Sequence, residues 1–109
     1  MMPSISRNDP AYSDNDYWRG RIWAPMNFLA YLALRKKGAS EAGKMLAEKS
    51  RKLLLLEWEK YGHVHENYNA ETGMGCDVAS SDKFYHWGGL LGLIAFMDAG
   101  YIKSPEEPI

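Results

Sequence analysis

Three segments of the chain carry apolar side chains at helical spacing, and polar stretches separate them. The first is MNFLAYLALRKK, which follows Pro25 and ends before Gly38. Proline is favoured in the first turn of a helix and glycine just beyond the last turn, so these residues mark a helix from about Pro25 to Lys37. Apolar side chains occupy nearly all of its faces, which predicts that this helix is buried.

The second segment predicts an amphipathic helix from Ser40 to about Lys60. Serine is a favourable N-cap, and Gly62 lies just beyond the expected last turn. One stripe of the helix carries the apolar side chains, at Ala42, Met45, Leu46, Leu53 and Leu56. The opposite side is rich in charged residues, which predicts a helix that packs on one face and is solvated on the other.

A third helix is expected from about His86 to Ala99, with Gly100 just after its end. Its apolar stripe consists of Trp87, Leu90, Leu91 and Ile94. Three glycines interrupt the segment, and each weakens a helix by about 1 kcal/mol relative to alanine. Such a cost predicts that a neighbour approaches the backbone closely at one or more of Gly88, Gly89 and Gly92.

Polar stretches surround the helices. Residues 1–16 form a polar N-terminal arm, residues 62–85 a long loop rich in Gly, Asn and Ser, and residues 104–109 a loose tail. Loops longer than about 12–15 residues in compact domains are often functional. The sequence therefore predicts an all-α fold of about three main helices with long connecting loops. Two of these helices are too apolar to cover each other, so a larger body is expected to complete the fold.

Charge and composition narrow the functional classes. The formal net charge is −1, so no basic excess attracts nucleic acid or an anionic membrane surface. The longest apolar run, from about Trp87 to Met97, is roughly half of the ~20 residues that span a bilayer, and MMPSISRNDP lacks the apolar core of a signal peptide. The single cysteine, Cys76, excludes an internal disulfide and slightly favours a reducing compartment such as the cytoplasm, while the compartment of a longer parent protein stays open. No cofactor is indicated.

The segment YWRGRIWAP, residues 17–25, places aromatic and cationic side chains directly before the first helix. Filling the core is the commoner role of large aromatic residues such as Trp18 and Trp23. The alternative is a wall on which sugar rings stack, where Arg19 or Arg21 donates hydrogen bonds to hydroxyl or carboxylate groups.

A second candidate segment, GHVHENYNAETG, lies in the long loop and contains Glu66. Inverting glycosidases use one carboxylate to activate water and a carboxylic acid, roughly 6.5–9.5 Å away, to protonate the leaving oxygen. The amide and aromatic neighbours of Glu66 could hold such a carboxylate and its water. An exposed loop carboxylate is the commoner alternative for any single Glu.

Two other chemistries compete for the same loop. His63, His65 and Glu66 suggest a metal site, but zinc would need a further ligand, for which His86 is only a distant candidate, and we expect no metal. A nucleophilic role for Cys76 is weaker still, because the sequence assigns no base to it.

Three stretches together resemble glycoside hydrolase family 63, the mannosyl-oligosaccharide glucosidase family, which also includes hydrolases of mannosylglycerate and glucosylglycerate. They are YWRGRIWAPMNFLAYLAL, HVHENYNAETGMGCD and FYHWGGLLGLIAFMDAGY, and they cover about residues 17–101 in matching order and spacing. The resemblance implies that residues 17–103 are the C-terminal portion of an (α/α)6 toroid. It also implies hydrolysis of α-glycosidic bonds with inversion, as by an α-glucosidase acting on oligosaccharides or small glycosides.

The resemblance assigns roles to individual residues. Glu66, in HENYN, matches the general base. The positions that match substrate-binding residues of the family are Tyr17, Trp18, Arg19, Gly20, Trp23, Asn67, Tyr68 and Trp87. The expected partner is a carbohydrate substrate, with glucose favoured over mannose.

One part of the family's pattern has no counterpart. The family's general acid is an Asp well upstream of the YWRG motif, and Asp14 and Asp16 are too close to that motif to match it. A general acid contributes a factor of about 10²–10⁴ in rate, so the chain alone is expected to have little or no activity. A missing N-terminal segment or a partner subunit would supply the acid and the remaining helices. The alternatives are a non-catalytic sugar-binding relative and a helical interaction module completed by a partner.

Overall fold

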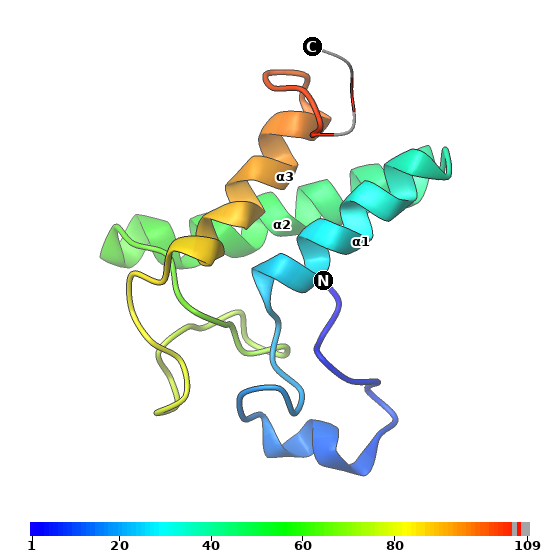
Figure 1. The fold of residues 1–109 in the computed structure, drawn as a ribbon. Helices are drawn as coiled ribbons and strands as arrows, with labels where there is room; N and C mark the ends of the chain where they lie inside the picture. The colour runs from blue at the N-terminus through cyan, green and yellow to red at the C-terminus, as the bar shows by residue number, and fades with distance from the viewer. Residues whose placement is uncertain (106, 108–109) are drawn as a thin grey trace.

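Three α-helices dominate the structure, a computed structural model that describes residues 1–105 and 107 (Figure 1). α1 spans Ala24–Lys36, α2 spans Ser40–Tyr61 and α3 spans Leu90–Asp98, and two short 3₁₀ helices, η1 (Pro10–Asp14) and η2 (His86–Gly89), precede α1 and α3. Within the described residues no strand forms, and the loops pair only through isolated bridges. The prediction of an all-α fold with three main helices and long loops is confirmed, and the arrangement is consistent with part of an (α/α)6 toroid.

Local signals set the helix ends close to their predicted places. Pro25 lies in the first turn of α1, and α2 ends at Gly62, whose φ of 69° is the left-handed conformation that glycine adopts most readily. Ser40 is the first residue of α2 rather than its N-cap. The predicted third helix is divided, because its glycine-rich start forms the 3₁₀ turn η2 and the α-helix begins only at Leu90.

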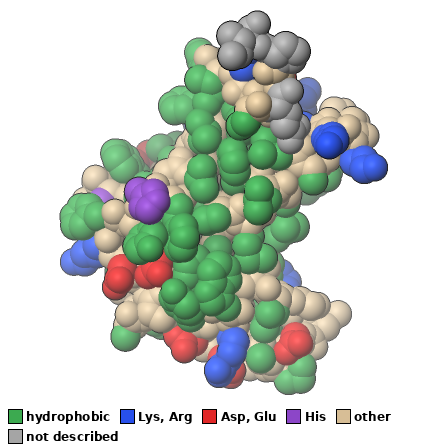
Figure 2. Space-filling model, in the orientation of Figure 1, with side chains coloured by type: hydrophobic (Ala, Val, Ile, Leu, Met, Phe, Trp, Pro, Cys, Tyr) green, Lys and Arg blue, Asp and Glu red, His purple; other side chains and the backbone are tan. Residues whose placement is uncertain are grey.

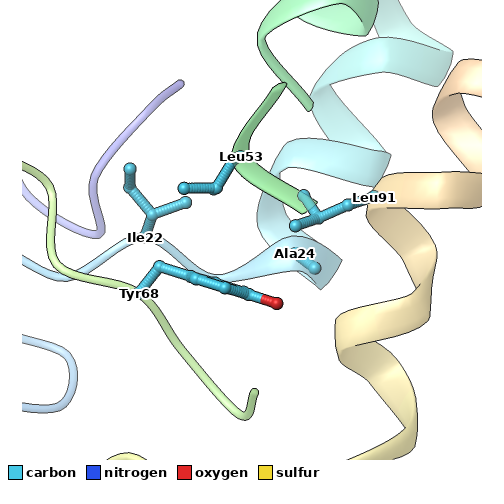
Figure 3. Packing of buried hydrophobic residues seen from close by; sticks show 5 residues of the cluster. All are labelled: Ile22, Ala24, Leu53, Tyr68 and Leu91. Atoms are coloured by element: carbon cyan, nitrogen blue, oxygen red, sulfur yellow. The ribbon is translucent and has the colours of Figure 1, made fainter. Parts of the chain in front are cut away.

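Two apolar clusters hold the helices together, and α2 packs against both α1 and α3. The first cluster joins loop residues to all three helices and consists of Ile22, Ala24, Leu53, Tyr68 and Leu91 (Figure 3). The second cluster lies between the helices themselves and consists of Tyr31, Leu46, Ala47, Ile94 and Met97. Tyr68 lies in the long loop, so the first cluster fixes that loop against the helical layer.

The buried face of α2 differs from the predicted stripe. Met45 and Leu56 are 59% and 44% exposed, whereas Ser50 and Glu57 are almost completely buried. The reason is that both polar residues have partners, since the Ser50 hydroxyl donates to the Leu46 carbonyl at 2.7 Å and Glu57 faces a histidine of the long loop. Because these two polar side chains are hydrogen-bonded, they can be buried, and the packed face of α2 is therefore rotated relative to the predicted apolar stripe.

The prediction that α1 is buried is wrong for this chain. Leu29 is 65% exposed, and the buried residues of the helix are Ala24, Asn27 and Tyr31. On the face shown in Figure 2, hydrophobic side chains form a broad band that continues over the helices and the loops. The three helices therefore leave apolar surface uncovered.

The glycines of the third segment have different surroundings. A β-carbon on Gly88 would lie 2.9 Å from the Cβ of Val64 and closer still to the carbonyl oxygen of His65. A β-carbon on Gly92 would lie 3.3 Å from a methyl group of Leu54, and one on Gly89 would meet nothing within 4 Å. The predicted close approach of a neighbouring backbone is thus confirmed at Gly88 alone.

The chain ends pack against the helices. Met1 packs on both apolar clusters, and the backbone N–H and carbonyl of Met2 pair with the Asn27 side chain at 2.9 and 3.0 Å. Near the other end, Glu107 lies 2.6 Å from Arg35 of α1. The predicted loose tail at residues 106, 108 and 109 lies outside the described residues. No helix in the described part of the chain is long and apolar enough to cross a bilayer.

Candidate active site

Glu66 lies in the long loop between α2 and η2 and is 6% exposed. Its N–H donates to the carbonyl of Asp82 at 2.8 Å, and the N–H of Asp82 donates to its carboxylate oxygen Oε2 at 3.2 Å. The start and the end of the loop therefore clamp each other through this glutamate. The clamp fixes both the backbone and one carboxylate oxygen.

Four aromatic residues, which we call the aromatic wall, gather beside Glu66: Tyr17, Trp18, Trp23 and Trp87. The indoles of Trp18 and Trp23 stack with centroids 3.7 Å apart, and the ring of Trp87 meets Trp23 edge-on at 5.8 Å. The indole N–H of Trp87 donates to the backbone carbonyl of Glu66 at 3.3 Å. The first and third sequence motifs thus meet the loop of the second motif in space.

The members of the wall differ in how far a ligand could reach them. Tyr17 and Trp18 are each 41% exposed, whereas Trp23 is fully buried and its indole N–H donates to the Tyr17 carbonyl at 2.8 Å. Trp23 therefore fills the core and supports Trp18 from behind. Trp23 covers one face of the Trp18 indole, and the exposed part of that ring is the surface on which a sugar could stack.

Tyr17 brings its hydroxyl close to the carboxylate of Glu66. Partial burial and the negative charge and hydrogen bonding of Glu66 raise the pKa of Tyr17 above its ordinary value. Tyr17 adopts a positive φ of 45°, and its N–H donates to the Ser80 hydroxyl at 3.2 Å. Such backbone conformations are costly for a bulky residue and persist where neighbouring contacts hold them.

An open hollow of about 680 Å³ adjoins the clamp around Glu66. Asp82 and Tyr85 are among the residues that line it, and the Tyr85 ring lies 4.6 Å from the ring of Trp87. The hollow therefore lies on the Asp82 side of the clamp, and neither Glu66 nor a residue of the aromatic wall lines it.

The two arginines of the first motif have different environments. Arg19 is exposed and pairs with Asp14 at 2.5 Å, at the outer edge of the site. Arg21 is fully buried and directs its donors at protein acceptors, so it does not face a sugar as one interpretation of the motif required. Between them, Gly20 has φ 105° and packs directly under the carbonyl of Tyr12, where no side chain fits.

Asn67 and Tyr68, the two residues after Glu66, are fully buried. The Asn67 amide donates to the Ser80 carbonyl at 2.7 Å, and the Tyr68 hydroxyl accepts from the N–H of His65 at 3.1 Å. Burial raises the pKa of Tyr68 to about 12, with opposition from that backbone hydrogen bond. In this conformation the two residues hold the loop, and the part in substrate binding that the resemblance implies for them stays a prediction.

Sequence reasoning missed a set of buried polar contacts next to Glu66. The Nε2 atom of His65 lies 3.2 Å from the carboxylate of Glu57, and its Nδ1 atom lies 2.9 Å from the Cys76 sulfur. Burial raises the pKa of the Cys76 thiol, which disfavours the nucleophilic thiolate. The helical stripe of α2 gave no signal for a buried Glu57, because its partner comes from a distant loop.

Metal ligation receives no support from this part of the molecule. The rings of His63 and His65 lie 4.7 Å apart, but both nitrogens of His65 face protein groups. Among residues 1–105 and 107, no three His, Cys, Asp or Glu side chains are placed to hold a metal ion.

Known proteins share this segment. The family described as the mannosylglycerate hydrolase MGH1-like glycoside hydrolase domain matches residues 1–87. Mannosylglycerate hydrolases MGH1 and MGH2 of Selaginella moellendorffii are each 31% identical over 74 residues, which is 68% of this chain and 14% of theirs. Mannosyl-oligosaccharide glucosidase of Saccharomyces cerevisiae is 30% identical over 102 residues, covering 81% of this chain.

The chain spans only 12% to 14% of the length of these curated relatives. No solved structure matches it. The match to the family includes both the YWRGRIW segment and the HENYN loop that the structure brings together.

Proposed function

The chain belongs to the family of mannosylglycerate hydrolase MGH1-like glycoside hydrolases, and from that membership we propose that it is part of an inverting α-glycosidase with Glu66 as the general base. The observation that carries the proposal is the placement of Glu66. Its carboxylate is nearly buried, clamped by the amide of Asp82 and adjacent to the Tyr17 hydroxyl. A base that removes a proton from water needs such a fixed carboxylate.

The proposed base needs acceptor capacity for a water molecule. An ionised carboxylate has about four acceptor sites on its two oxygens. The amide of Asp82 occupies one of these directions and the Tyr17 hydroxyl lies close by, so the carboxylate keeps acceptor capacity for the attacking water. In the proposed reaction Glu66 takes the water proton while the oxygen attacks the anomeric carbon from the face opposite the leaving group.

The aromatic wall supplies the other half of the proposed site. The partly exposed ring of Trp18 offers a stacking face for the sugar, while Trp23 stacks beneath Trp18 and the edge-on ring of Trp87 packs against Trp23. The names of the relatives indicate either a small glycoside such as mannosylglycerate or a larger oligosaccharide. We propose an α-glucoside as the first substrate class and an α-mannoside as the second.

The general acid of the proposed reaction comes from polypeptide other than these 109 residues. Asp14 is paired with Arg19, and Asp16 accepts a hydrogen bond from the Ser80 hydroxyl at 2.5 Å, so both carboxylates already serve the local structure. Without an acid the leaving group departs unprotonated, which costs a factor of about 10²–10⁴. The chain alone is therefore expected to turn over substrate very slowly.

A specific observation favours a second candidate, a helical interaction module completed by other polypeptide. Leu29 of α1 and Phe96 of α3 are 65% and 54% exposed, and Figure 2 shows a hydrophobic band on one face of the molecule. Exposed apolar patches of this kind mark surfaces that bind other protein. Polypeptide that binds this surface would also supply the remaining helices and the general acid to the proposed site.

The test compares Glu66→Gln with Glu71→Gln in polypeptide that carries the complete catalytic domain. Glu71 is the matched control, because it lies in the same loop but is exposed and pairs with Arg7. We expect Glu66→Gln to lower kcat by about 10²–10⁴ and to leave sugar binding intact, since the base acts on water rather than on ground-state affinity. Glu71→Gln should behave as the unmodified protein.

Two results would refute the proposal. One is a kcat of Glu66→Gln close to that of the unmodified protein. The other is a product with retained anomeric configuration, followed by NMR during the first minutes of hydrolysis. Rapid turnover by the 109-residue chain alone would refute the external acid.

A further inference from the structure

Arg21 is completely buried at the centre of the loops, and all five of its N–H donors are used. A guanidinium offers five such donors in one rigid plane. Nε donates to Asn67 Oδ1. Nη1 donates at 3.0 Å to Asn15 and at 3.4 Å to Asp77, and Nη2 donates at 2.5 Å to Asp77 and at 3.3 Å to the Met74 carbonyl. No donor remains for a sugar.

The acceptors belong to the segments that surround the proposed base. Asn67 directly follows Glu66, and Asn15 lies two residues before Tyr17 of the aromatic wall. Asp77 lies at the far side of the long loop and supplies the opposite charge. Arg21 therefore connects the base, the wall and the outer part of the loop at one point.

The connection continues from Asn67 to the carboxylate itself. The Asn67 amide donates to the Ser80 carbonyl at 2.7 Å, and the Ser81 hydroxyl donates to the Asn67 carbonyl at 2.8 Å. The next residue, Asp82, holds Glu66 Oε2 through its N–H. A displacement of Asn67 is thereby transmitted to the base both through the peptide bond and through this clamp.

A buried cation at this place needs a reason. Burying a charge is unfavourable unless it is paired and fully hydrogen-bonded, and an apolar side chain could fill the same volume. Only a guanidinium can donate in one plane to five acceptor atoms on the four residues Asn15, Asn67, Met74 and Asp77, whereas a lysine satisfies at most three. The hydrogen bonds of Arg21 therefore indicate that its role is to hold these acceptors in a fixed arrangement.

We propose that Arg21 is a positioning residue of the glycosidase reaction, which fixes the carboxylate of Glu66 relative to the aromatic wall through Asn67. The inference rests on the proposed function of Glu66. Reacting groups displaced by about 1 Å lose on the order of 10²-fold in rate, so a positioning residue affects kcat more than substrate affinity.

The experiment measures kcat, KM and the melting temperature of Arg21→Lys, Asn67→Ala and the double variant in the complete catalytic domain, well below every melting temperature. Arg35→Lys is the matched control, because Arg35 also donates to several acceptors, Tyr31, Met97 and Glu107, but at the far end of α1. We expect Arg21→Lys to lower kcat by about 10–100-fold with little change in KM. In the double variant the two losses should not multiply, because both changes break one connection.

The outcomes separate this inference from the proposal on which it rests. An active Glu66→Gln protein refutes the function of the base. An inactive Glu66→Gln protein together with full kcat in Arg21→Lys, or with losses that multiply in the double variant, refutes the positioning role alone. If Arg21→Lys does not fold, Asn67→Ala decides: a folded protein with unchanged kcat overturns the inference. Equal loss of kcat in Arg35→Lys would also overturn it, since the effect would then be general.

Discussion

Replacing Gly88 or Gly89 by alanine should shift the stability of the chain in opposite directions. The two glycines are neighbours in η2, and neither has a positive φ. A β-carbon on Gly88 would lie 2.9 Å from the Cβ of Val64 and even closer to the His65 carbonyl oxygen, whereas one on Gly89 would meet nothing within 4 Å. Gly89 is also the N-cap of α3, but its φ of −65° and ψ of −16° are already helical, so the pair differs mainly in packing.

The expected magnitudes follow from two opposing effects. Alanine in place of glycine stabilises a helical segment by about 0.5–1 kcal/mol, and this gain applies to both positions. Overpacking costs about 1–3 kcal/mol, and the cost at Gly88 should be in the upper part of that range because the neighbour is backbone that cannot rotate away. We expect Gly88→Ala to lower the free energy of unfolding by about 1–2 kcal/mol, and Gly89→Ala to raise it by about 0.5–1 kcal/mol.

Urea unfolding followed by circular dichroism at neutral pH measures both variants. With a slope of about 1–3 kcal/mol/M for small proteins, the two midpoints should differ by about 0.5–3 M while the slopes stay equal. Equal midpoints, or a more stable Gly88→Ala protein, would refute the close approach of η2 to the loop. That approach matters for the site, because the carbonyl that must move belongs to His65, the residue before Glu66.

Two further predictions concern the buried histidine and the exposed helix. Burial and the nearby His63 lower the pKa of His65, although the charge of Glu57 acts in the opposite direction. The unfolded chain therefore binds more protons than the folded chain near and below about pH 6.5, the ordinary pKa of histidine. The free energy of unfolding should consequently fall as the pH decreases from about 6.5. In His65→Gln the slope of stability against pH between 7 and 5 should be smaller, and an unchanged slope in urea titrations would contradict this. Leu29→Lys should change the stability of the chain by no more than about 0.5 kcal/mol, because Leu29 is 65% exposed, yet it should prevent association with any polypeptide that covers α1. Calorimetry and size-exclusion chromatography test the two parts, and undisturbed association would show that α1 is not covered there.

The helices could be predicted because their signals are local. Pro25, Gly38 and Gly62 bracket α1 and α2 within a residue or two of the observed ends. The buried face of α2 could not be predicted in the same way. Glu57 is buried because His65 lies against it, and that partner is contributed by a loop whose path the helical pattern does not contain.

The candidate site likewise has features that the sequence predicted and features that depend on distant partners. The resemblance placed Tyr17, Trp18, Glu66 and Trp87 in one site, and the structure brings these residues together, although it leaves their catalytic roles untested. Sequence reasoning left Arg21 open as a possible donor to sugar. Its real acceptors lie up to 56 residues away, so no spacing rule could show that the guanidinium faces inward.

Glu66 is held between two anchors of different chemistry, and this difference gives each anchor its own experimental signature. On one side Tyr68, two residues later, packs with Ile22 and Leu53 in the apolar cluster of Figure 3, and its backbone pairs with Ile22 at 2.8 and 2.9 Å. On the other side Arg21 holds Asn67 by directed hydrogen bonds. Apolar contacts are short-ranged and tolerant of direction, so their loss lowers the stability of the whole fold before it rotates any single group. Hydrogen bonds from a rigid fork fix orientation, so their loss should rotate the carboxylate while the helical layer stays folded. Melting temperature should therefore respond mainly to the apolar anchor, and kcat mainly to the polar one.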